Sequence, residues 1–141
     1  MSARRLLICD DEEGFGRFVA RVARQLDFDV RVTTRGTDFM RCFAEFGPDT
    51  VVVDMVMPEM DGRALVIWLA ERGYTSDVIM ISGYDPGHAL IEGLRARCSG
   101  LRSLITLRKP IDIDDLRRAL AEKDPACRQR TGALRAGAGA P

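Results

Sequence analysis

The sequence lacks any long hydrophobic run, and this absence excludes several classes of protein. Its apolar runs are short and interrupted by charge, whereas a membrane-spanning helix needs about 20 predominantly apolar residues. The first run, residues 6–9, is too short for a secretory signal, and the acidic residues 10–13 follow it directly. We therefore predict a cytoplasmic protein that does not insert into a membrane.

An excess of either charge is also absent, and cysteine is scarce. The 141 residues include 21 basic and 21 acidic side chains. A protein that binds nucleic acid through broad phosphate contacts is usually basic, so direct nucleic-acid binding is disfavoured. The four cysteines, at positions 9, 42, 98 and 127, have neither metal-site nor redox-motif spacing. We interpret them as reduced thiols of a cytoplasmic protein.

What the chain does contain is a regular alternation of short apolar runs with helical patterns. The runs at 6–9, 30–33, 50–53, 78–81 and 104–107 are candidate strands, and apolar residues recur at helical spacing after each of them. Five strand-helix repeats predict an α/β fold, with a doubly wound parallel sheet covered by helices on both faces. The third run lacks polar alternation, as expected for a central strand, whereas alternation in the second indicates a position nearer an edge.

This alternation ends near residue 123. Asp124 and Pro125 interrupt the last helical pattern, and residues 131–141 show no apolar periodicity. We predict one globular domain over residues 1–123 and a flexible C-terminal tail over residues 124–141.

Reactive side chains stand at the ends of four predicted strands. Asp10 and Asp11 follow the first, Asp54 the third, Ser82 the fourth and Lys109 the fifth. Because the carboxyl ends of parallel strands share one edge of the sheet, these groups should converge. Clustered carboxylates and phosphate oxygens together suit Mg²⁺, and a lysine ammonium suits a phosphoryl oxygen. The cluster therefore predicts phosphorylation of a central carboxylate, Asp54.

At these positions the chain resembles the receiver domain of two-component response regulators. The matching segments are ICDDE at 8–12, VDMVMPEMDG at 53–62, MISG at 80–83 and KP at 109–110. A single motif would be a weak signal, but four in the right order at four strand ends are specific. The resemblance implies a flavodoxin-like (βα)5 sandwich whose parallel strands follow the order 2-1-3-4-5, and a single-domain regulator.

The resemblance also implies a role for each acidic group. Asp54 is the expected phosphoacceptor and contributes to the metal site. Asp11 is expected to bind Mg²⁺ directly, and Asp10 mainly through water. The backbone carbonyl of Val56 is expected to be a further ligand of the ion.

The remaining implications concern the phosphoryl group and its source. Ser82 and Lys109 are expected to hold phosphoryl oxygens, and the peptide bond before Pro110 is often cis in this family. The implied donor is a phosphohistidine on a histidine kinase or a histidine phosphotransfer protein. A downstream protein is expected to bind the face formed by the fourth helix, the fifth strand and the fifth helix. The protein is then a switch between two conformations, not an enzyme beyond catalysing its own phosphorylation and dephosphorylation.

The sequence departs from the family at several positions. Thr106 replaces the usual aromatic residue three positions before the lysine, so a pseudo-receiver scaffold with altered switching is an alternative. Three arginines near the fifth strand predict a specialised partner face: Arg95, Arg97 and Arg102. Val66 and Ile67 are candidates for a second partner-facing patch. Val56 and Tyr84 occupy positions that influence phosphate lifetime in the family, and neither can orient an attacking water, which predicts slow self-dephosphorylation.

Two further classes of protein use a similar fold or similar functional side chains. An aspartate-nucleophile phosphatase or dehalogenase also combines Mg²⁺, a hydroxyl and a lysine, but its acid-x-acid motif does not fit the first strand. A flavin-binding protein would need a phosphate-binding loop there, and the acids at 10–13 would repel phosphate. Residues alone leave open whether the receiver is part of a longer regulator.

Overall fold

The computed structural model describes residues 3–121, which form a five-stranded parallel sheet in the order β2-β1-β3-β4-β5. The strands are β1 Arg5–Cys9, β2 Asp29–Thr33, β3 Thr50–Asp54, β4 Asp77–Ser82 and β5 Ser103–Arg108. The helices are α1 Glu13–Gln25, α2 Gly36–Phe46, α3 Gly62–Glu71, α4 His88–Arg97 and α5 Ile113–Ala121. The predicted fold class and strand order are confirmed.

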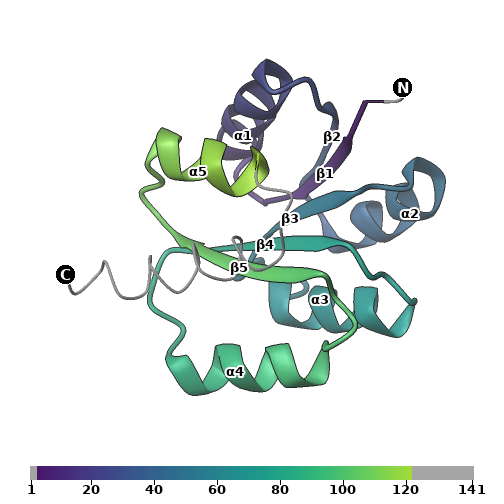
Figure 1. Cartoon of the computed structure of the whole chain (residues 1–141), viewed down its shortest axis with the longest axis vertical. Coiled ribbons are helices and arrows are strands. Elements are labelled where there is room, and N and C mark those ends of the chain that lie inside the picture. The colour runs from purple at the N-terminus through teal and green to yellow at the C-terminus, as the bar shows by residue number, and fades with distance from the viewer. Residues whose placement is uncertain (1–2, 122–141) are drawn as a thin grey trace.

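Helices cover both faces of the sheet (Figure 1). α1 and α5 pack on one face, and α2, α3 and α4 pack on the other. Successive strand residues point to opposite faces, so Val52 of β3 enters one apolar cluster while Val51 and Val53 enter the other. All five residues of β3 are buried, as expected for a central strand, and β2 is an edge strand as predicted.

Side-chain caps fix two of the loops at the carboxyl edge of the sheet. The carboxylate of Asp61 accepts a hydrogen bond of 2.8 Å from the backbone N–H of Ala64 and so caps α3. Asp112 accepts a bond of 2.8 Å from the N–H of Asp114 at the start of α5. Both caps satisfy backbone donors that a helix leaves unpaired at its first turn.

The predicted domain boundary at residue 123 and the predicted tail lie outside the described residues. Within residues 3–121, no helix has the length and apolar character that crossing a bilayer requires.

Candidate functional site

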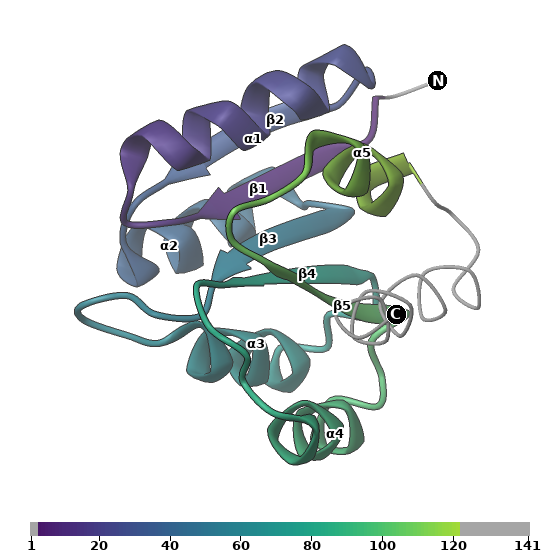
Figure 2. The ribbon, with the colours of Figure 1, turned by 90° about the vertical axis from the view of Figure 1, so that its left-hand side faces the viewer.

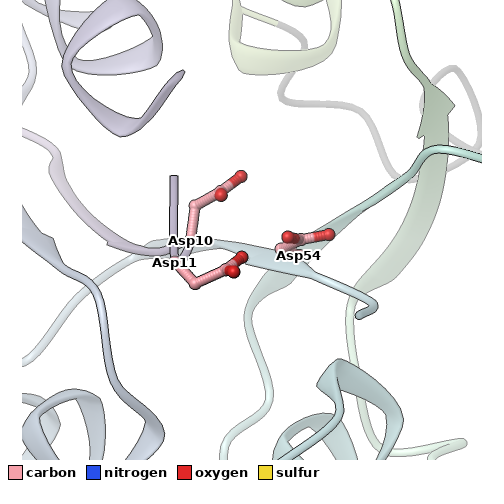
Figure 3. Close-up of side chains that lie close together, drawn as sticks. All are labelled: Asp10, Asp11 and Asp54. Carbon is pink, nitrogen blue, oxygen red and sulfur yellow. The ribbon is translucent and has the colours of Figure 1, made fainter. Parts of the chain in front are cut away.

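Three carboxylates meet at the carboxyl edge of the sheet. Figure 2 shows this edge in the backbone, where the strands end and their loops begin. Asp10 and Asp11 directly follow β1, Asp54 is the last residue of β3, and these two strands are hydrogen-bonded neighbours. One carboxylate oxygen of each residue lies within 4.8 Å of the others (Figure 3). Asp10 and Asp54 are buried and Asp11 is exposed. The expected convergence of these acids is therefore observed.

Burial makes the charged forms of two of these acids unfavourable. Desolvation raises the pKa of Asp10, and desolvation together with the charge of Asp10 raises the pKa of Asp54 to about 6. One oxygen of Asp10 accepts a hydrogen bond of 2.9 Å from the N–H of Glu12. The other, Oδ2, is buried and receives no hydrogen bond from any described residue. An unsatisfied buried carboxylate oxygen in an acidic cluster is suited to a bound cation.

Lys109 brings an ammonium group into this cluster. Its Nζ lies 3.1 Å from Oε1 of Glu12, 3.6 Å from Oδ2 of Asp10 and 3.9 Å from Oδ2 of Asp54. It also lies 4.5 Å from the ring centre of Phe15, within the range of a cation–π contact. Burial alone would lower the pKa of Lys109, but the bond to Glu12 and the charges of the two aspartates raise it above its usual value. The ammonium therefore stays charged.

The backbone of neighbouring strands places Lys109 at this position. Its N–H donates a hydrogen bond of 2.7 Å to the carbonyl of Ser82, directly after the last register pair of β4 and β5. The peptide bond between Lys109 and Pro110 is cis, as expected from the resemblance. Sequence reasoning missed the contacts of Lys109 with Glu12 and Phe15, because these residues are far from Lys109 along the chain.

Ser82 lies at the same edge, but its hydroxyl forms hydrogen bonds within the turn that directly follows it. The hydroxyl donates a hydrogen bond to the carbonyl of Tyr84 and accepts one of 3.1 Å from the N–H of Tyr84. Tyr84 is 48% exposed. A contact between the Ser82 hydroxyl and a phosphoryl group on Asp54 would therefore require the hydroxyl to leave this turn.

The loop after Asp54 is packed closely against it. The N–H of Val56 donates a hydrogen bond of 3.3 Å to Oδ1 of Asp54, and Val56 is 56% exposed. Gly62 begins α3 so near to β3 that a Cβ atom added there would lie 2.3 Å from the carbonyl oxygen of Asp54. Glycine at position 62 therefore permits the close approach of α3 to the site.

The structure places the residues of the two predicted partner surfaces. Two of the three arginines contact the domain itself: Arg95 donates a bond of 2.9 Å to the carbonyl of Leu104, and Nε of Arg102 lies 3.7 Å from the buried Asp77. The suggestion that Val66 belongs to a partner-facing patch is wrong, because its side chain is completely buried. Ile67 is half-buried.

Comparison with known proteins agrees with this site. The sequence model of the response regulator receiver domain matches residues 6–121. The chain is 30% identical over 112 residues to the regulatory protein AtoC of Escherichia coli, covering 79% of this chain and 23% of that protein. It is 26% identical over 117 residues to the chemotaxis protein CheY of Listeria monocytogenes, covering 82% and 94% respectively.

Solved structures give the same result. The receiver domain of the Francisella response regulator 1452 is 26% identical, with a TM-score of 0.70 and coverage of 91% of this chain and 98% of that one. The chain spans between 23% and 52% of the length of the first curated relatives that it matches. With its family match, its fold and its pocket of Asp10, Asp11 and Asp54, the chain belongs to the response regulator receiver family, a signalling module rather than a classical enzyme.

Proposed function

We propose that this receiver accepts a phosphoryl group on Asp54 from a phosphohistidine of a partner protein and thereby changes its contacts with other proteins. The observation that carries the proposal is the position of Asp54, a buried carboxylate beside two further acids and within 3.9 Å of the Lys109 ammonium. The family membership supports the donor class, because receivers imply a histidine kinase as phosphodonor. A histidine phosphotransfer protein is the second source of the same chemistry.

The reaction exchanges one bond to phosphorus for another. A carboxylate oxygen of Asp54 attacks the phosphorus, the bond from phosphorus to the imidazole nitrogen breaks, and the imidazole leaves with its electron pair and takes up a proton. An acyl phosphate remains on Asp54. The Lys109 ammonium is placed to compensate the charge of the phosphoryl oxygens. Ser82 is proposed to bind one of these oxygens after its hydroxyl leaves the Tyr84 turn.

The acidic cluster fits Mg²⁺. The cluster offers only oxygen ligands, its carboxylates lie close together, and Oδ2 of Asp10 is buried without a hydrogen bond from a described residue. We propose Asp10, Asp11, Asp54 and the carbonyl of Val56 as the groups that hold the ion, with Asp10 acting mainly through water. When bound, the ion neutralises charge on the carboxylates and the phosphoryl oxygens.

The output is proposed to be a protein contact on the face of α4, β5 and α5. The phosphoryl group would shift the balance between two conformations through Ser82 and Lys109, and this face would differ between them. Thr106 lies on β5 in register with Met80, where it leaves no aromatic side chain to move with Ser82. This substitution keeps the alternative of a scaffold with altered switching, although the intact acidic set favours phosphorylation.

The test is incubation of the chain with Mg²⁺ and a small acyl-phosphate donor, followed by measurement of the intact mass. We expect the mass of one added phosphoryl group on the wild type and on Asp38→Asn, a matched change of an aspartate outside the pocket. We expect no adduct on Asp54→Asn, and none on the wild type after chelation of the metal. An adduct that persists on Asp54→Asn would overturn the proposal, and so would its absence from the wild type.

A further inference from the structure

A cavity lies along the open edge of β2, outside the acidic cluster. Its volume is about 590 Å³, which is enough to hold a ligand or a short chain segment. It is bounded by the first turns of α1, by the end of β2 and by one side of α2. Six of its lining residues carry the argument: Glu13, Arg17, Val32, Asp38, Arg41 and Glu45.

The floor of this cavity is a strand edge with unpaired backbone groups. Among the strands that the structure describes, β2 is hydrogen-bonded to β1 only. The N–H of Asp29 bonds the carbonyl of Arg4, and the carbonyl of Thr33 accepts from the N–H of Asp10, so residues 29 and 33 direct their groups towards β1. Because these groups alternate along a strand, Val32 directs its N–H and C=O to the open edge. No described residue bonds them. Such an edge is a template for one more strand.

The walls of the cavity carry a small net negative charge. α1 and α2 pack on opposite faces of the sheet and stand on either side of β2 (Figure 1). Glu13 pairs with Arg17 on the α1 wall, and Asp38 lies 3.6 Å from Arg41 on the α2 wall. Glu45 forms no ion pair with any residue that the structure describes. Arg31 of β2 also reaches the α2 wall, where its Nη1 lies 3.9 Å from Sγ of Cys42, so Glu45 is the wall acid that a positively charged strand can complement.

The chain itself contains a segment of this character. Residues 128–135 hold three arginines, Arg128, Arg130 and Arg135, and no acid. In an extended strand the side chains of residues 128 and 130 lie on the same face, so both can reach one wall of the cavity. This segment thus combines the charge that the walls lack with backbone groups that can pair with Val32.

The segment is also within reach. α5 runs opposite to the parallel strands and ends at Ala121. Its C-terminal end therefore lies beside the amino ends of the strands, where β2 begins. β2 lies four strand spacings from β5, which is about 19 Å. Residues 122–127 can span about 20 Å when extended. Residue 128 would then arrive at the start of β2, and the segment could continue parallel to it.

We propose that residues 128–135 of this chain bind along β2 as a sixth strand, between α1 and α2. The strand would pair with the outward N–H and C=O of Val32, and its arginines would face Glu45 and the other acids of the walls. The carbonyl of Thr33 accepts a hydrogen bond from the N–H of Asp10, so the added strand would also restrain the turn that carries the acidic pocket. The proposal does not depend on phosphorylation of Asp54.

Hydrogen exchange of backbone amides in the 141-residue chain, measured by NMR, tests the proposal. Without a partner, the outward N–H of Val32 should exchange rapidly, whereas pairing with residues 128–135 should slow it at least about tenfold. We expect Arg128→Glu with Arg130→Glu to remove this protection, because it replaces the attraction to the walls with repulsion. The matched control is Arg21→Glu with Arg24→Glu, the same charge change at exposed positions of α1 outside the cavity, which should preserve protection.

A charge exchange supplies the second arm of the test. Glu45→Arg should remove the protection of Val32, and its combination with Arg130→Glu should restore part of it. Equal exchange of Val32 in the wild type and in the Arg128 and Arg130 variant would overturn the proposal. Protection that falls on dilution would also overturn it, because it would identify a second copy of the chain as the occupant. The amide of Val52 in central β3 should remain protected throughout and reports that the domain is folded.

Discussion

The Nζ atom of Lys109 lies 3.6 Å from Oδ2 of Asp10, the buried oxygen that receives no hydrogen bond from any described residue. This separation permits attraction between charges but is too long for a hydrogen bond. One ammonium thus faces Asp10, Asp54 and Glu12 without fully satisfying any buried oxygen of the pocket. The metal-free pocket should therefore reduce the stability of the fold at neutral pH, and this can be measured.

Replacing Lys109 by methionine should lower the stability of the metal-free protein further. The change keeps most of the side-chain volume but removes the ammonium that offsets the charge of Asp54, so the pKa of Asp54 should rise further. At pH 7.5, without metal, we expect the free energy of unfolding to fall by about 1–2 kcal/mol. Urea denaturation measures this change. Lys109→Arg, which keeps the charge, should lose less stability than Lys109→Met.

The pH dependence distinguishes a loss of charge compensation from a loss of packing on Phe15. Near pH 4 Asp54, whose pKa is raised to about 6, is largely protonated, so Lys109→Met should cost much less stability there than at pH 7.5. An equal cost at both pH values would contradict the electrostatic explanation.

Asp54→Asn should stabilise the metal-free protein, with a dependence on pH that follows from the raised pKa. The pKa of Asp54 rises from 3.8 to about 6 in the fold, so the folded state holds a proton that the unfolded state releases in this interval. The stability that this group contributes is therefore complete below about pH 4 and is lost as the pH rises through 6. The uncharged asparagine should raise the free energy of unfolding by about 1–2 kcal/mol at pH 7.5, after allowance for screening, and little at pH 4.

Denaturation of both proteins in chelator, at a series of pH values, checks this expectation. Saturating Mg²⁺ should stabilise the wild type more than Asp54→Asn, because the ion compensates a charge that the variant lacks. A constant difference between the two proteins from pH 4 to pH 7.5 would exclude titration of Asp54 as the cause.

The sequence predicted much of this architecture because its signals are local. Each predicted strand agrees with the observed one to within one residue at either end, since β-branched and apolar runs stop where polar loop residues begin. The convergence of Asp10, Asp11 and Asp54 followed from parallel topology alone. The strand order, in contrast, came from the family resemblance, because local patterns do not say which strands are neighbours.

Other features depended on packing and could not be predicted locally. The hydroxyl direction of Ser82 depends on its rotamer and on the turn to Tyr84. The contact of Lys109 with Glu12 joins residues 97 positions apart. Val66 is buried because α3 is covered on more than one side, so three consecutive apolar residues gave a misleading indication of exposure.

Gly62→Ala should disturb both the fold and the site. The added Cβ would lie 2.3 Å from the carbonyl oxygen of Asp54, so α3 or the end of β3 must move. Overpacking of this kind costs about 1–3 kcal/mol, and the displaced Asp54 should accept the phosphoryl group more slowly. The control is Gly93→Ala in α4, where an added Cβ meets no atom of residues 3–121 within 4 Å. That change should stabilise the helix by about 0.5–1 kcal/mol.

Thermal and urea denaturation compare the two glycine variants, and intact mass over time follows phosphorylation. Equal stability of the Gly62 and Gly93 variants would show that position 62 tolerates a side chain, contrary to the close approach of α3 to the end of β3.

The acyl phosphate, once formed, should be long-lived. Val56 and Tyr84 border the site with exposed side chains that carry neither a carboxylate nor an amide to orient an attacking water. We expect the variant with Val56→Asn and Tyr84→Glu to lose its phosphoryl group several-fold faster after the donor is removed, as followed by intact mass. A wild-type half-life no longer than that of the variant would contradict this prediction, while leaving acceptance of the phosphoryl group itself untouched.

Thr50→Val should stabilise the domain, although it removes a polar group from a central strand. The Thr50 side chain is completely buried, and its hydroxyl oxygen has no hydrogen-bond partner among the described residues. Valine has nearly the same shape and removes the cost of burying that hydroxyl, so we expect the free energy of unfolding to rise by about 1 kcal/mol.

The matched change is Thr33→Val, because the hydroxyl of Thr33 donates a hydrogen bond of 2.7 Å to the carbonyl of Ile8. That variant should lose about 0.5–1.5 kcal/mol. The opposite signs of the two changes, measured by urea denaturation, distinguish hydrogen-bond satisfaction from the general strand preference of valine, which would stabilise both.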